Sequence, residues 1–240
     1  MSRLPKLLRL LPTCLCSALA LGAGSCMADT LVLAGGSSSR DADYAYLGAI
    51  IPIGSKLDEN GLRLRLWLEH LHYNYGTGAT AHTASATGSS IGVGYRYGLS
   101  PGSSITLGIG ARYRDTRITL PDPANRASGG QTTALLSLDG QFSASDTVSA
   151  SFNAEYVPSS THAYWSRVRV PFTITSGGLT LGPEAAFHGS SVYHARQFGL
   201  VLGGLLPASS GLDLNLLAGT SKLSGRSSKG YGGVELGYRF

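Results

Sequence analysis

Hydrophobic and polar residues alternate along most of the chain that follows residue 29. Between Leu62 and Glu69 every second residue is Leu, and polar or aromatic residues occupy the positions between them. The same period of two recurs over residues 105–114 and 148–156. Such an alternation gives a strand one apolar and one polar face, and no helical period competes with it. The pattern therefore predicts half-buried β-strands.

Turn residues divide the alternating region into twelve predicted strands. They cover residues 30–38, 42–54, 61–76, 80–98, 104–118, 130–143, 147–157, 162–174, 178–188, 192–206, 211–222 and 230–240. An even number is typical of single-chain bacterial outer-membrane barrels. In lipid every backbone N–H and C=O must be paired, so an open sheet edge is not tolerated. We therefore predict an all-β fold, a single closed antiparallel transmembrane β-barrel of about twelve strands over residues 29–240. With the N-terminus in the periplasm, the longest loop, residues 119–129, would face outside.

Residues 1–28 have the pattern of a secretory signal peptide. Three basic residues precede an apolar stretch over residues 10–23, and small residues at Cys26 and Ala28 favour cleavage before Asp29. A retained membrane anchor and lipidation at Cys26 are the alternatives. A secreted chain that forms a barrel is expected in the cell outer membrane after the signal peptide is cleaved.

Composition agrees with a membrane barrel. Charged residues make up only 14% of the chain, against about 25% in an ordinary soluble domain. The net charge of +5 includes three positive charges and no negative ones within residues 1–28, so cleavage leaves +5 − 3 = +2. That small excess removes the case for a nucleic-acid partner. All three cysteines lie upstream of Asp29, and we expect no disulfide, metal site or cofactor.

The C-terminal segment has the most specific local pattern. Apolar residues alternate at Val234, Leu236, Tyr238 and Phe240, and the chain ends on an aromatic residue. This is the pattern of a terminal strand that the barrel assembly machinery reads, and the alternative is the last strand of a soluble sandwich. Tyrosines near the ends of the predicted strands are expected to form aromatic girdles at the two lipid interfaces. They are Tyr73, Tyr75, Tyr95, Tyr97, Tyr113, Tyr156 and Tyr238.

The polar faces of the predicted strands would line the lumen. By alternation the inward set comprises Arg63, Arg65, Trp67, Glu69, Arg96, Arg112, Arg114, Asp139, Gln141, Asn153, Glu155, Trp165, Arg167, Arg169, Glu184, Asp213, Glu235 and Arg239. Eight arginines face six acids, a slight positive bias. One interpretation is an interior filled by its own salt bridges. The other is a polar path on which sugars stack against indole and bind guanidinium. The candidate glycan contacts are Arg63, Arg65, Trp67, Arg112, Arg114, Trp165, Arg167 and Arg169.

An enzyme site has weak support in the sequence. His188 and Ser190 fall on one strand face near Glu184, and a serine nucleophile needs a base within hydrogen-bond reach. A barrel lipid hydrolase would carry this group on its lipid side, but Glu184 belongs to the inward set. The sequence has no zinc-protease or phosphate-loop motif. We therefore predict a protein that is not an enzyme.

Several short blocks, in order, resemble the bacterial cellulose biosynthesis protein S (BcsS) family. They are RDADYAYLGA (40–49), GLRLRLW (61–67), YNY (73–75), RYRDT (112–116), PDPANR (121–126), AYWSRVR (163–169), LGPE (181–184), ARQFGLVLGG (195–204) and the C-terminal segment. The resemblance implies a role in cellulose or related exopolysaccharide production, with no catalytic residues to transfer. An export or export-assisting channel is the first hypothesis. A non-conducting accessory barrel that docks periplasmic secretion proteins is the second hypothesis. A small-solute porin and a lipid hydrolase are less favoured alternatives. The partners implied are outer-membrane lipid, cellulose or a related glycan, other cellulose-secretion proteins and the barrel assembly machinery.

Overall fold

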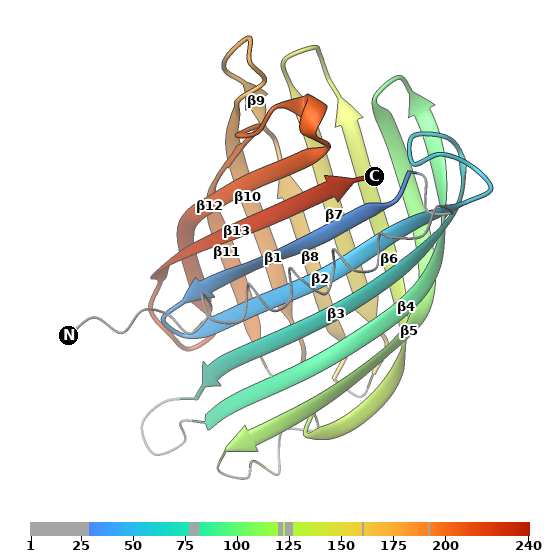
Figure 1. Ribbon diagram of the computed structural model, residues 1–240. Helices are drawn as coiled ribbons and strands as arrows, with labels where there is room; N and C mark the ends of the chain where they lie inside the picture. The colour runs from blue at the N-terminus through green and yellow to red at the C-terminus, as the bar shows by residue number, and fades with distance from the viewer. Residues whose placement is uncertain (1–28, 77–81, 120–121, 123–126, 160, 192) are drawn as a thin grey trace.

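The computed structural model describes residues 29–76, 82–119, 122, 127–159, 161–191 and 193–240, which form a closed antiparallel β-barrel (Figure 1). The predicted signal peptide and most of the loop at 119–129 lie outside the described residues. The strands are β1 (Leu31–Ser39), β2 (Ala42–Ile53), β3 (Gly61–Tyr75), β4 (His82–Ser100), β5 (Ser103–Thr119), β6 (Gly129–Ser143), β7 (Ser149–Val157), β8 (Ala163–Arg169), β9 (Phe172–Thr173), β10 (Thr180–Gly189), β11 (His194–Gly203), β12 (Leu212–Leu223) and β13 (Lys229–Arg239). A single turn of 3-10 helix covers Ala208–Ser210.

The twelve predicted strands are confirmed, with one interruption. The strand expected over 162–174 is divided into β8 and β9, and both pieces pair with β10. Pro171 lies at the break, and proline has no N–H to donate to a neighbouring strand. The neighbouring Val170 N–H still donates to the carbonyl of Pro183 at 3.1 Å. The two pieces thus form one side of the barrel, which has twelve strands in all.

The barrel closes between the first and last strands. β1 pairs with β13 in antiparallel register from Leu31 opposite Arg239 to Ser39 opposite Tyr231. Every other neighbouring pair follows chain order, including β10 with β11. No helix among the described residues is long and apolar enough to cross a membrane.

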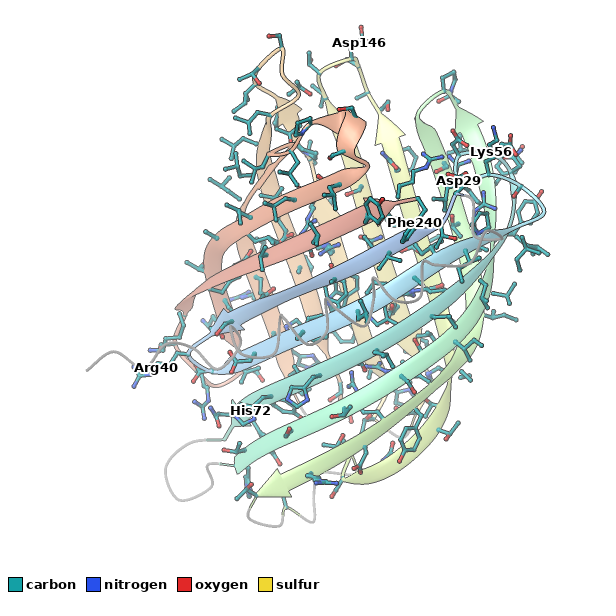
Figure 2. The ribbon with its side chains drawn as sticks, in the orientation of Figure 1. Asp29, Arg40, Lys56, His72, Asp146 and Phe240 are labelled. Atoms are coloured by element: carbon teal, nitrogen blue, oxygen red, sulfur yellow. The ribbon has the colours of Figure 1, made fainter. Side chains whose placement is uncertain are left out.

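Asp29 ties the start of the described chain to its end. Asp29 and Phe240 lie close together at one end of the barrel (Figure 2). The Asp29 carboxylate accepts a hydrogen bond from Arg239 Nε at 2.6 Å and another from the backbone N–H of Leu57. The Phe240 N–H donates to the carbonyl of Thr30 at 3.1 Å. Burial favours the neutral form of Asp29, but the Leu57 N–H and the Arg239 guanidinium outweigh it and lower the pKa of this carboxyl.

The outward faces of the strands are apolar, as the alternation predicts. Leu107 and Ile109 on β5 are 65% and 70% exposed, which suits contact with lipid rather than water. The exposed tyrosines of the predicted girdles are Tyr95, Tyr97, Tyr113 and Tyr156. Tyr238 also lies on the outward face, where its ring meets Phe240 edge-on at 4.5 Å.

Tyr73 and Tyr75 do not belong to a girdle, so this part of the prediction is wrong. Tyr73 is only 6% exposed and its ring lies 5.2 Å from that of Tyr193. Tyr75 follows two positions later on β3 and its ring lies 5.7 Å from that of Tyr73. Both residues are an even number of positions from Arg65 and Trp67 on the same strand, so all four side chains share one face (the same parity). This face is the inside of the barrel.

Candidate functional site: the lumen

Inward side chains enclose a cavity of about 330 Å³ in the barrel interior. This volume lies at the small end of the range for pockets that hold small ligands. Its wall includes Trp67 and Trp165 together with most of the charged residues of the predicted inward set. The two tryptophans are thus brought to one cavity, as the alternation predicts.

A row of aromatic rings covers one wall. The ring of Tyr46 is stacked on the indole of Trp67 at 4.9 Å and 10°, and Tyr44 lies 5.8 Å beyond Tyr46. A Cβ atom added to Gly48 would collide with Trp67, and one added to Gly35 would lie 2.9 Å from Tyr46. Each ring therefore occupies the space that the neighbouring strand's glycine leaves open. The Arg65 guanidinium lies over the indole, 4.6 Å from its centroid, so the faces of Trp67 are engaged within the protein.

Ion pairs connect strands that are not neighbours in the sheet. Arg65 on β3 pairs with Glu155 on β7. Arg167 on β8 donates to Glu235 on β13 at 2.5 Å, and Arg169 donates to the other oxygen of the same carboxylate at 2.6 Å. These pairs cross the interior rather than follow its wall.

Two further carboxylates complete the network. Glu184 accepts hydrogen bonds from Arg169 Nε at 2.5 Å and from the Tyr231 hydroxyl at 3.1 Å. Glu69 accepts from Arg112 Nε at 3.0 Å and from Arg114 Nη2 at 2.7 Å. Every arginine that lines the cavity therefore has a carboxylate partner. This matches the first sequence interpretation, an interior filled by its own salt bridges.

The lumen is not positively biased, which corrects the count made from alternation. Arg63, Arg96 and Arg239 do not line the cavity. Of the predicted inward set, five arginines and six carboxylates line the cavity, and Asp43, which lies outside that set, adds a seventh carboxylate. The members of the predicted set are Arg65, Arg112, Arg114, Arg167 and Arg169 against Glu69, Asp139, Glu155, Glu184, Asp213 and Glu235.

Arg63 holds a turn at the end of the barrel near the termini. It is 3% exposed, and its guanidinium donates to the carbonyls of Lys56 at 2.6 Å and Glu59 at 2.5 Å and to Ser55 Oγ at 2.8 Å. Arg96 donates to the carbonyl of Asp58 in the same turn at 2.6 Å. Parity places both arginines inward, but their height along the strands places them beside the turn at residues 54–60.

Two carboxylates of the cavity are hydrogen-bonded to amides instead of arginines. Asp139 accepts from Asn153 Nδ2 at 2.8 Å, and Asp213 accepts from Asn215 Nδ2 at 2.9 Å. Trp165 lies nearby on β8 with the Arg167 guanidinium 5.3 Å from its ring centroid. No described cluster of His, Cys, Asp and Glu could hold a metal ion.

The sequence reasoning missed the inward tyrosines Tyr44, Tyr46, Tyr193 and Tyr231. Alternation on β2 contained the signal for two of them, because Tyr44 and Tyr46 share the parity of Gly48. Tyr231 shares the parity of Glu235 on β13. Tyr193 lies in the turn before β11, where no alternation applies.

The possible hydrolase group does not have the geometry of a lipid-facing triad. His188 and Glu184 both line the lumen cavity, out of reach of lipid chains. The Glu184 carboxylate is engaged by Arg169 and Tyr231, and the His188 ring packs edge-on against Tyr193 at 6.1 Å.

Closure, an apolar exterior and a polar, ion-paired interior define an outer-membrane β-barrel. Solved structures of such barrels share the fold. The KdgM porin in complex with disordered oligogalacturonate aligns with a TM-score of 0.54 at 12% identity, over 88% of this chain and 99% of that one. The β domain of the Bordetella autotransporter BrkA aligns at 0.50 and 14%, over 88% and 97%. LpxR from Salmonella typhimurium aligns at 0.50 and 10%, over 88% and 100%. These identities show the fold alone.

The family is identified by sequence. Residues 31–240 match the family described as Cellulose biosynthesis protein BcsS. The chain belongs to this family, which confirms the resemblance found in the sequence. No curated protein matches the chain.

Proposed function

We propose that the protein lies in the outer membrane and serves cellulose biosynthesis as an accessory barrel that conducts no glucan chain. The observation that carries this proposal is the set of ion pairs across the lumen, Arg65 with Glu155 and Arg167 and Arg169 with Glu235. A glucan chain would have to separate these pairs in order to pass. Losing one partner of a buried pair costs about 3–5 kcal/mol, and neutral sugar hydroxyls bring no charge to replace the partner.

The turn at residues 54–60 supports a docking role. Arg63 and Arg96 fix its carbonyls, and the Asp29 carboxylate binds its Leu57 N–H. A turn held this firmly presents the exposed charges of Lys56, Asp58 and Glu59 in a fixed arrangement. With the termini in the periplasm, this surface would face the periplasmic cellulose-secretion proteins. We assign the barrel no catalytic step.

Export through the lumen is the second candidate. The amide-bonded carboxylates Asp139 and Asp213 and the indole of Trp165 offer hydroxyl acceptors and a stacking surface. The KdgM porin, a barrel of the same fold, has been solved with an oligogalacturonate. This candidate requires the ion pairs to open during export.

Single-channel conductance in planar bilayers distinguishes the two candidates. The accessory role predicts that the refolded wild-type protein stays closed. The double variant Arg65→Ala and Glu155→Ala removes one crossing pair without leaving a lone charge, and it should conduct. A wild-type protein that conducts, with currents blocked by cello-oligosaccharides, would overturn the proposal in favour of export.

A further inference from the structure

Two cations lie side by side on the outward face of the barrel, at the end opposite the termini. Arg196 on β11 is directly opposite Lys222 on β12, and both side chains are exposed. Like charges directly opposite each other on adjacent strands repel and destabilise the pair. Neither cation has a carboxylate within ion-pair distance among the described residues. By contrast, the outward Arg117 on β5 has Asp115 at 3.5 Å.

The surface beneath this pair is apolar and aromatic. Phe187 on β10 is directly opposite Arg196, and Phe198 follows two residues later on the same face of β11. The two rings meet edge-on at 5.7 Å. Phe198 and Leu200 are 49% and 53% exposed. The cations therefore lie at the boundary between an apolar band and a polar rim, the level of a lipid headgroup.

The strand beside Lys222 leaves room for a bound group. Gly230 and Gly232 take the outward positions at the start of β13, because Tyr231 between them points inward to Glu184. A Cβ atom at Gly230 would meet nothing within 4 Å. Gly230 is directly opposite Thr220, two positions from Lys222 on the same face of β12, so an open strip without side chains lies diagonally beside the cation pair, and a headgroup could rest on it.

We propose that Arg196 and Lys222 bind the phosphate of a phosphorylated membrane lipid. The phosphate would lie between the guanidinium and the ammonium, and would relieve their repulsion through charge-assisted hydrogen bonds. The acyl chains would follow Phe198 and Leu200 toward the middle of the membrane. The inference rests on the proposed outer-membrane location, but not on whether the lumen conducts.

The test measures lipid A retention by native mass spectrometry. The folded full-length barrel is titrated in a zwitterionic detergent, with phosphate-free diacylglycerol as the control lipid. The double variant Arg196→Gln and Lys222→Gln should bind lipid A about tenfold more weakly or worse, since two charge-assisted contacts are lost. The matched control Arg117→Gln removes an outward arginine that already has a carboxylate partner, and it should bind like the wild type.

Heat-modifiable migration on gels establishes that each variant is folded, and Arg196→Lys keeps the charge and should retain binding. Equal lipid A affinity in the folded double variant would overturn the proposal. So would an equal loss in Arg117→Gln, which would indicate a general charge effect. If inorganic phosphate binds at this pair as tightly as lipid A, the ligand is a free anion and the lipid assignment fails. None of these outcomes depends on conductance, so failure here is distinct from failure of the accessory role.

Discussion

The lumen network makes a quantitative prediction for Glu235→Gln. The carboxylate accepts from Arg167 at 2.5 Å and from Arg169 at 2.6 Å, and its side chain is only 13% exposed. Glutamine keeps the shape and one acceptor oxygen but removes the charge. Arg169 would retain Glu184 as a partner, whereas Arg167 would keep only the longer contact to Asn153 at 3.4 Å.

The expected cost follows from that asymmetry. The Arg167 guanidinium, on a side chain that is 20% exposed, loses its counter-ion, and breaking a fully buried pair typically costs about 3–5 kcal/mol. Because this pair is only partly buried and Arg167 retains the Asn153 amide oxygen, we expect a loss of no more than about 3 kcal/mol in the free energy of unfolding. Asp115→Asn is the matched control. Its partner Arg117 has a side chain that is 87% exposed, and an exposed pair contributes at most about 1 kcal/mol.

Urea unfolding of the refolded barrel in lipid vesicles, followed by tryptophan fluorescence, measures both variants. If Glu235→Gln loses no more stability than Asp115→Asn, then the crossing pairs do not hold the lumen together and the reasoning fails. Replacing both Glu235 and Arg167 by methionine should recover most of the loss, because neither charge is then left unpaired.

Further predictions concern the two termini and the indoles. N-terminal sequencing of the purified protein should begin at Asp29, and a lipidated Cys26 would refute the cleavage prediction. Asp29→Asn should destabilise the barrel at neutral pH; since the folded pKa is lowered from 3.8, the difference in urea midpoint should vanish as the pH falls through that lower value. Deleting Phe240 should reduce the heat-modifiable folded fraction, and normal levels would refute its role in assembly. The folded double variant Trp67→Ala and Trp165→Ala should leave cellulose output unchanged, and a fall would favour the glycan-wall hypothesis.

The strands were predictable because the two faces of each strand meet different surroundings. The leucines between positions 62 and 68 and the charged residues between them fix both the strand and its inward face. The same parity also assigned six lumen carboxylates correctly. Tyr73 and Tyr75 lie near the end of β3, as a girdle residue would, but their positions in the alternation turn both side chains inward.

The partners across the lumen could not be predicted from the sequence. Parity gives the face on which Arg65 lies, but not its height in the barrel, which depends on strand tilt and stagger. The pairing of Arg65 with Glu155 therefore emerges only in three dimensions. The same limit explains Arg63, which points inward yet lies beside the turn at residues 54–60.

The pairing of Leu31 with Arg239 has a consequence for the kinetics of assembly. This contact joins the two ends of the described chain, so its sequence separation is nearly the largest within the described residues. The loop-closure entropy must therefore be lost before the contact can stabilise the barrel. Every hairpin can form from local contacts, whereas the β1–β13 seam requires all twelve strands to be in place. We therefore expect closure to be the slow, cooperative step, during which two sheet edges stay open to wrong pairing. A truncated chain that lacks either edge strand would remain at that stage.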